Sequence, residues 1–245
     1  MGLKQRIDKL LVEQNLCKSR ERAKALIMAG RVLADNTPCD KPGTQVPVDT
    51  HLSIKGEDLP YVSRGGLKLE AALNQNQIDC TGMICLDVGA STGGFTDCLL
   101  QHGAAKVFSV DVGYGQLAWS LRQDQRVVVI ERTNIRKIDP SLISSPVDLI
   151  VIDTSFISLR IVVPSVLRFL KPDGNILALI KPQFEAGKGF VGKGGVVKDP
   201  ALHKKIIYEL RLFFTDHKLV CGPVTPSPIR GPKGNREFII LLRQR

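Results

Sequence analysis

The sequence lacks the features that mark secreted, membrane-spanning and metal-stabilised proteins. Its six cysteines form no C-x-x-C pair, so neither a disulfide scaffold nor a zinc site is expected. No stretch approaches the ~18 uncharged apolar residues of a membrane span, and charged residues follow the first methionine too closely for a signal-peptide core. We therefore expect a cytoplasmic protein with reduced thiols, no metal and no membrane partner.

Aromatic residues are also scarce, at 5% of the chain, which disfavours a stacking platform for single-stranded nucleic acid. Positive charge, by contrast, is in excess. The net charge of +10 divides into +4 for residues 1–56, −2 for residues 57–180 and +8 for residues 181–245. Two basic segments around a near-neutral middle indicate either a polyanion held from two sides or a solvated surface that aids solubility. Charge alone leaves both interpretations open.

The first 55 residues combine short helical and strand patterns. An apolar stripe at helical spacing precedes Ser19, which is placed to cap a second helix that stops at Gly30. Strands are expected at residues 31–34 and 51–54. The pattern R-I-D-K-L-L … S-R-E-R-A-K-A-L-I-M-A-G-R-V-L-A-D resembles the S-four-type RNA-binding domain, over about residues 5–55.

Basic residues lie on or near the exposed face of that second helix and at several other positions. On such a face they can reach phosphates without disturbing the core, although a solvated helix face is the simpler alternative. A glycine-rich basic loop at residues 187–195 could likewise wrap RNA or be only a mobile surface loop. The predicted RNA-binding set is Arg6, Lys18, Arg20, Arg22, Lys24, Arg31, Arg64, Lys188 and Lys193.

Residues 57–63 have the composition of a linker, and strands and helices alternate after it. Continuously apolar runs indicate strands buried on both faces, as in a parallel sheet, at 84–88, 107–110, 127–130, 149–152 and 176–180. Two more strands, at 219–224 and 238–242, are expected to be antiparallel. We predict an α/β, doubly wound, Rossmann-like domain at residues 64–245, mostly parallel with an antiparallel last strand, after a small α+β RNA-binding domain at residues 1–56.

A glycine-rich turn, L-D-V-G-A-S-T-G-G-F-T, joins the first of these strands to a helix. Glycines let a ligand approach the backbone, and the helix N-terminus offers free N–H groups. Asp87 precedes the first glycine, where an acid suits the ammonium of a methionine better than the pyrophosphate of a nicotinamide cofactor. Asp111 ends the second strand, where a carboxylate would bind ribose hydroxyls, and Asn134 follows the third, near an adenine edge.

The motif D-V-G-A-S-T-G-G-F-T resembles motif I of class I methyltransferases, particularly the FtsJ-like RNA ribose methyltransferases. This resemblance implies a class I methyltransferase sheet with S-adenosyl-L-methionine as the cofactor. The predicted cofactor-binding residues are Asp87, Gly89, Ala90, Ser91, Thr92, Gly93, Gly94, Phe95, Thr96, Asp111, Val112, Asn134 and Asp153.

Four charged residues are the predicted catalytic set: Lys68, Asp153, Lys181 and Glu237. Asp153 and Lys181 end buried strands, at the edge where α/β sheets bind ligands. In order and local context the four resemble the K-D-K-E tetrad of FtsJ-like ribose methyltransferases. A ribose 2′-hydroxyl is a poor nucleophile, so its proton must be removed or shared during attack on the methyl group. Lys181 would take that proton or only steer the hydroxyl, and the two carboxylates would orient the lysines.

Both halves together resemble the TlyA/hemolysin A family over nearly the whole chain. This resemblance implies 2′-O-methylation of cytidine in ribosomal RNA, with ribosomal RNA or ribosomal subunits as partners and a monomer as the expected state. The linker departs from some relatives because Leu59-Pro60-Tyr61-Val62 contains no tryptophan. Two alternatives stay open. The intact tetrad disfavours a non-catalytic RNA-binding assembly factor, and the missing membrane span disfavours a membrane-active hemolysin.

Overall fold

The computed structural model describes residues 3–17, 19–28, 30–55, 59–187, 189–192 and 194–244. They form two compact units, Met1–Pro60 and Tyr61–Arg245, and the division falls within the predicted linker. Lys18, Lys188 and Lys193 of the predicted RNA-binding set lie outside the described residues. Within the described ranges, no helix is long and apolar enough to cross a membrane, and no cluster of side chains could hold a metal ion.

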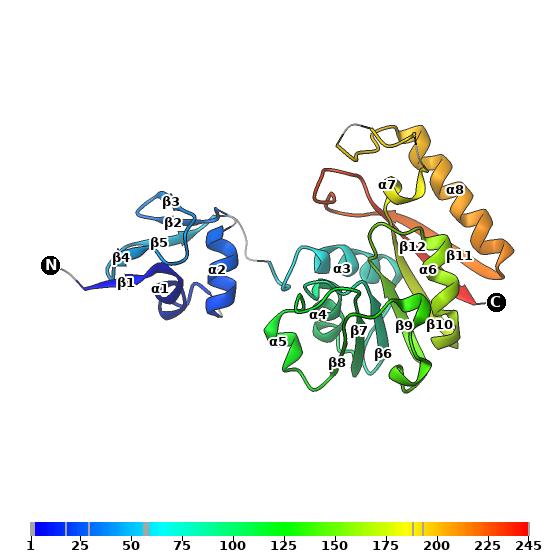
Figure 1. The fold of residues 1–245 in the computed structure, drawn as a ribbon, viewed down its shortest axis with the longest axis horizontal. Coiled ribbons are helices and arrows are strands. Elements are labelled where there is room, and N and C mark those ends of the chain that lie inside the picture. The colour runs from blue at the N-terminus through cyan, green and yellow to red at the C-terminus, as the bar shows by residue number, and fades with distance from the viewer. Residues whose placement is uncertain are drawn as a thin grey trace. The chain divides into compact units, whose positions relative to one another are not determined.

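The N-terminal unit packs two helices against short strands (Figure 1). Its core is built on Ile7, Leu11 and Ile27, which are fully buried. Ser19 Oγ accepts a hydrogen bond from Arg22 N at 3.2 Å, which confirms the predicted helix cap. The elements are β1 (Lys4–Arg6), α1 (Ile7–Glu13), α2 (Arg20–Met28), β2 (Val32–Ala34), β3 (Thr37–Cys39), β4 (Gln45–Pro47) and β5 (Leu52–Ile54).

Sequence patterns do not predict three of these strands. All five strands have three residues, but β1, β3 and β4 lack the apolar residues that indicate β2 and β5. β3 also contains Pro38, which favours a turn. It is tolerated because β3 lies at the edge of the β3-β2-β5 sheet, where a missing N–H need not break the ladder.

The C-terminal unit is a seven-stranded sheet with the strand order β11-β12-β10-β9-β6-β7-β8. The five strands from β10 to β8 pair in parallel, and β12 is antiparallel to both of its neighbours. The predicted doubly wound α/β class with an antiparallel last strand is therefore confirmed. The strands are β6 (Ile84–Val88), β7 (Lys106–Val110), β8 (Val127–Ile130), β9 (Val147–Ile152), β10 (Leu170–Ile180), β11 (Leu219–Pro226) and β12 (Phe238–Gln244).

Helices cover both faces of this sheet, and each face has its own apolar core (Figure 1). Leu73 and Leu99 pack α3 and α4 against one face, and Val162 and Phe214 pack α6 and α8 against the other. The helices are α3 (Gly65–Asn76), α4 (Gly94–Gln101), α5 (Trp119–Arg122), α6 (Leu159–Val166), α7 (Pro182–Glu185) and α8 (Pro200–Asp216). Three short 3-10 helices, η1 (Ile135–Lys137), η2 (Pro140–Leu142) and η3 (Leu167–Phe169), complete the unit.

Candidate active site

The glycine-rich turn between β6 and α4 brings the ends of two strands together. Gly89 and Gly93 have φ values of +88° and +94°, in the region that favours glycine. A Cβ atom on Gly89 would lie 2.8 Å from the backbone oxygen of Asp153, so a larger residue would separate β6 from the chain after β9. The turn therefore places the start of α4 close to Asp153.

Asp87 lies beneath this turn and is fully buried. Its Oδ2 accepts a hydrogen bond from Thr96 Oγ1 at 2.7 Å, whereas Oδ1 has no partner among the residues that the structure describes. Burial raises the pKa of Asp87 to about 7, because the low-dielectric interior disfavours the carboxylate. The structure thus gives Asp87 a supporting position that links β6 to α4, and its contact with a cationic ligand stays a prediction.

Two adjoining cavities open at the carboxyl ends of the parallel strands. The first, about 540 Å³, contains the predicted turn residues Gly89, Ala90, Ser91, Thr92, Gly94 and Phe95 in its wall. The second, about 910 Å³, is lined by the predicted residues Asp111, Val112 and Asn134. Asp153 lines both cavities, whereas Asp87, Gly93 and Thr96 line neither of them.

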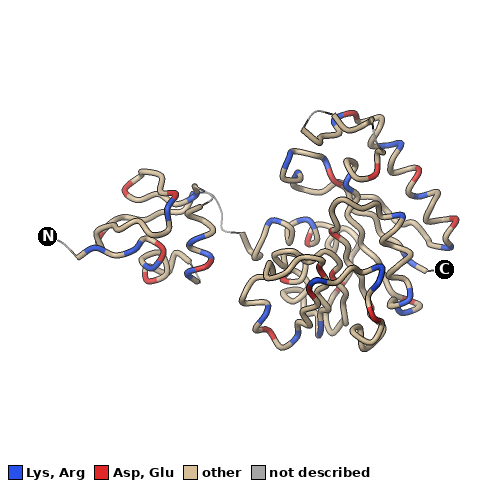
Figure 2. The backbone as a smooth tube through the Cα atoms, viewed as in Figure 1, with Lys and Arg blue, Asp and Glu red and all other residues tan. Residues whose placement is uncertain are grey.

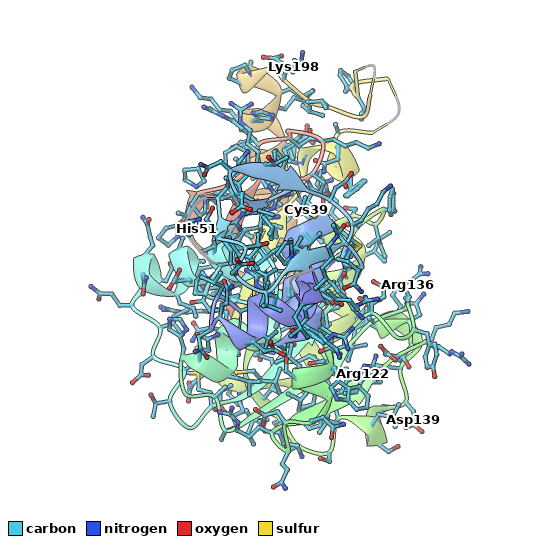
Figure 3. The ribbon with its side chains drawn as sticks, turned by 90° about the vertical axis from the view of Figure 1, so that its left-hand side faces the viewer. Cys39, His51, Arg122, Arg136, Asp139 and Lys198 are labelled. Atoms are coloured by element: carbon cyan, nitrogen blue, oxygen red, sulfur yellow. The ribbon has the colours of Figure 1, made fainter. Side chains whose placement is uncertain are left out.

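The second cavity is lined by a carboxylate, an amide and apolar side chains, which together can bind a nucleoside. Asp111 accepts backbone hydrogen bonds from Ser91 N at 2.8 Å and Gly113 N at 2.7 Å, and its oxygens keep lone pairs for ribose hydroxyls. Asn134 Oδ1 accepts from Arg136 N at 3.1 Å and so caps η1, and the exposed Arg136 side chain is labelled in Figure 3. Apolar side chains from β6, η1 and α6 complete the wall. These residues fit the adenosine part of S-adenosylmethionine.

The four predicted catalytic residues all line the first cavity and form two ion pairs. Lys68 Nζ, on α3, lies 2.6 Å from Glu237 Oε2, at the start of β12. Lys181 Nζ, at the end of β10, lies 2.6 Å from Asp153 Oδ1 and donates to Ser155 Oγ at 2.9 Å. Four segments that are distant in sequence therefore place two amines and two carboxylates beside the glycine-rich turn.

Glycine also allows the Lys68–Glu237 pair to pack closely. Glu237 is 2% exposed, and a Cβ atom on Gly231 would overlap its Oε1. Gly231 does not have a positive φ, so the need for glycine here comes from contact with Glu237. Sequence reasoning does not identify Gly231, because a glycine between a proline-rich strand and β12 has the pattern of an ordinary turn.

Two phenylalanines in the cavity wall also escape sequence analysis. Phe156 is 90% exposed, and its φ of +65° is unusual for a bulky side chain. Its ring centroid lies 5.0 Å from that of Phe184. An exposed aromatic residue in a strained conformation next to a cavity is a feature of functional sites. Their only signal in the sequence is that each follows a predicted catalytic residue by three positions.

The predicted RNA-binding arginines of the N-terminal unit have structural partners. Arg6 and Arg20 each place a guanidinium nitrogen 3.0 Å from Oδ2 of the buried Asp8. Hydrogen bonds from Arg6 and then Arg20 lower the pKa of Asp8 to about 2. Arg31 donates twice to the backbone oxygen of Lys55, at 2.8 and 2.9 Å. Arg22 and Lys24 lie half-buried on α2, and Figure 2 shows basic residues along both helices of this unit. RNA binding by these residues stays a prediction.

Arg64 belongs to the C-terminal unit and lines the first cavity together with Arg230 and Lys233. The described members of the predicted set therefore divide between the N-terminal unit and the cavity wall of the C-terminal unit. Arg230 and Lys233 lie in the loop between β11 and β12, and the sequence analysis does not identify them.

Comparison with known proteins matches both units. Residues 61–244 match the model of the FtsJ-like methyltransferase family, and residues 5–52 match the S4 domain. TlyA of Mycobacterium tuberculosis, named a 16S/23S rRNA (cytidine-2′-O)-methyltransferase, is 47% identical over 244 residues, which cover 99% of this chain and 91% of that protein. Hemolysin A of Brachyspira hyodysenteriae is 39% identical, and the match covers 96% of this chain and 98% of that protein.

A solved structure from Streptococcus thermophilus, described as a hemolysin, superposes with a TM-score of 0.77 at 42% identity. The match covers 100% of this chain and 90% of that one. These similarities extend over both units and confirm the resemblance that the glycine-rich motif and the tetrad suggest. The chain belongs to the TlyA/hemolysin A family of FtsJ-like methyltransferases.

Proposed function

We propose that the protein transfers a methyl group from S-adenosylmethionine to the 2′-hydroxyl of a cytidine in ribosomal RNA. The observation that carries this proposal is the convergence of Lys68, Asp153, Lys181 and Glu237 on one cavity beside the glycine-rich turn. The relative named for cytidine-2′-O-methylation matches nearly the full chain, which supports the choice of nucleotide and RNA.

When bound, S-adenosylmethionine supplies an electrophilic methyl group on its sulfonium. Asp111 and Asn134 would hold the ribose and adenine in the second cavity. Gly89 and Ser91 would contact the methionine part, because they line both cavities. Asp153 also lines both, so the reacting group would lie next to the Asp153–Lys181 pair.

Lys181 would act on the 2′-hydroxyl. Its ammonium is only slightly exposed and is held by Asp153 and Ser155, so its position is fixed before substrate binds. For transfer, the ammonium would first release a proton to solvent. The neutral Lys181 Nζ would then accept the hydroxyl proton as the oxygen takes the methyl group and the carbon–sulfur bond of the sulfonium breaks, and Asp153 would stabilise the ammonium that re-forms. The buried Lys68–Glu237 pair places a second cation beside the same cavity, where it stabilises negative charge that develops on the oxygen.

The exposed ring of Phe156 supports a nucleotide as the substrate. A ribose within folded RNA becomes accessible when its base leaves the stack, and an aromatic side chain compensates for the stacking that is lost. Phe156 offers such a face at the wall of the first cavity, beside Phe184. Arg64, Arg230 and Lys233 in the same wall would meet the neighbouring phosphates.

The test is to incubate the protein with labelled S-adenosylmethionine and ribosomal subunits, and to map the modified nucleotide. We expect label on the 2′-oxygen of a cytidine. Label on a base would contradict the assignment of the nucleophile. Binding without any transfer would instead support the RNA-binding assembly factor that the sequence leaves open.

A further inference from the structure

Gln183 carries a buried polar atom for which neither the fold nor the proposed chemistry accounts. Its side chain lines the first cavity, and its Oε1 is buried without a hydrogen-bond partner among the residues that the structure describes. The amines nearest to the chemistry are engaged elsewhere, because Lys181 pairs with Asp153 and Lys68 pairs with Glu237. A buried acceptor without a partner destabilises a protein, so such an atom points to a missing donor.

The position of Gln183 indicates where that donor would lie. Gln183 is in α7, which begins with Pro182 directly after Lys181 and includes Phe184. It lines the first cavity but not the second, where Asp111 and Asn134 form the nucleoside pocket. The amide is therefore in the wall of the cavity that contains Lys181, and it is not part of the adenosine pocket.

The surroundings of Gln183 suit a flat ring with a polar edge. Phe156 and Phe184 form an aromatic pair, with ring centroids 5.0 Å apart, that lines both cavities and so adjoins Gln183 in the first. A base that stacks on such a pair still has to satisfy the donors and acceptors along its edge. Cytosine has an exocyclic amine at that edge, which donates hydrogen bonds. An amide oxygen is a suitable acceptor for it.

We infer that Gln183 reads the target base, with its amide oxygen accepting a hydrogen bond from the exocyclic amine of cytosine. This inference rests on the proposed function and adds to it a residue that determines specificity. The other N–H donor that the cavity would admit is the ammonium of the cofactor methionine, and the experiment separates the two.

The experiment compares the wild type with Gln183→Glu and Gln183→Leu on RNA that has cytidine or uridine at the mapped position. A glutamine amide can rotate to offer its amino group to uracil, whereas a carboxylate can only accept. We expect Gln183→Glu to raise the cytidine-to-uridine ratio of kcat/KM at least about tenfold. We expect Gln183→Leu to lower kcat/KM on cytidine by a similar factor and to leave cofactor affinity, measured by calorimetry without RNA, unchanged.

Gln125→Glu is the matched control, because Gln125 is exposed and lines neither cavity. Equal cytidine-to-uridine ratios in the wild type and both Gln183 variants would overturn the inference. So would weaker cofactor binding by Gln183→Leu with an unchanged ratio, which would assign the amide to the methionine ammonium and leave the proposed function standing. A wild-type protein that transfers no methyl group to either RNA would overturn the proposed function and this inference together.

Discussion

At the residue scale, Asp87 shows how a buried motif residue can support the turn that forms a site. Its carboxylate lies in the core beneath the glycine-rich turn, where Thr96 donates to one oxygen. The folded protein therefore retains the carboxyl proton up to a pKa of about 7, whereas the unfolded chain loses it near the ordinary value of 3.8. Between these values the folded state binds more protons, so this group's contribution to stability falls as pH rises.

We predict that Asp87→Asn removes this dependence, because asparagine can accept from Thr96 but does not titrate. The free energy of unfolding of the wild type should decline relative to the variant between about pH 4 and pH 7, by at most ~1.4 kcal/mol per pH unit. Denaturant titrations of both proteins across that range measure the difference. A difference that is constant with pH would contradict the assignment of a buried, protonated Asp87.

At the scale of elements, the loop before β12 is tied to the chain before α8 by a single buried side chain. Asn235 is 2% exposed, its Oδ1 accepts from Val197 N at 2.9 Å, and its Nδ2 donates to Gly195 O at 2.9 Å. Its backbone oxygen also accepts from Gly231 N at 3.0 Å. Because Glu237 follows two residues later, this connection fixes the segment that carries one member of the tetrad.

We expect Asn235→Ala to destabilise the protein by about 1–3 kcal/mol, because the buried Val197 N–H and the carbonyl of half-buried Gly195 lose their partner. Hydrogen exchange at Val197 should increase in the same variant. Asn235→Asp is the matched comparison: it keeps the acceptor for Val197 N, but it removes the donor to Gly195 O and adds a buried negative charge, so it should also be destabilised. Alanine and aspartate variants with the stability of the wild type would show that the connection is dispensable.

Strand and helix periodicity predicts most elements of the C-terminal unit, because its strands are continuously apolar and its main helices α3, α4, α6 and α8 have 12, 8, 8 and 17 residues. Asp153 and Lys181 are also predictable, since they directly follow buried strands and the carboxyl ends of parallel strands meet at one edge. Lys68 and Glu237 are predicted only through the resemblance to the K-D-K-E tetrad. Phe156, Gln183 and Gly231 are not predictable from the sequence. The role of Phe156 depends on the exposure of its ring, that of Gln183 on an amide oxygen without a partner, and that of Gly231 on its close approach to Glu237. These features exist only in the folded structure. The burial of Asp87 likewise needs the packed structure.

At the scale of the whole molecule, RNA affinity should depend on the basic surface of the N-terminal unit. Arg20 is unsuited to a test because its removal would leave the buried Asp8 with one partner fewer. Arg22 and Lys24 lie on the same helix and are better suited, because Asp8 takes its ion pairs from Arg6 and Arg20.

We predict that the double change Arg22→Gln, Lys24→Gln weakens RNA binding. The slope of log affinity against log salt should become shallower by roughly 0.7–0.9 for each phosphate that the protein no longer neutralises. Cofactor affinity should not change, since both residues belong to the other unit. Binding titrations at several salt concentrations provide the slope. An unchanged slope would show that Arg22 and Lys24 contact no phosphate and form only a solvated helix face.

The methyl-transfer rate of Lys181→Ala, under single-turnover conditions with saturating RNA and cofactor, tests the proposed chemistry most directly. Loss of the amine that Asp153 and Ser155 hold in place should slow transfer by at least about 100-fold, as expected for a group that handles the proton of the nucleophile. RNA affinity should stay within a few-fold of the wild type. A variant that methylates the ribose at nearly the wild-type rate would contradict the claim that these paired amines and carboxylates activate the hydroxyl.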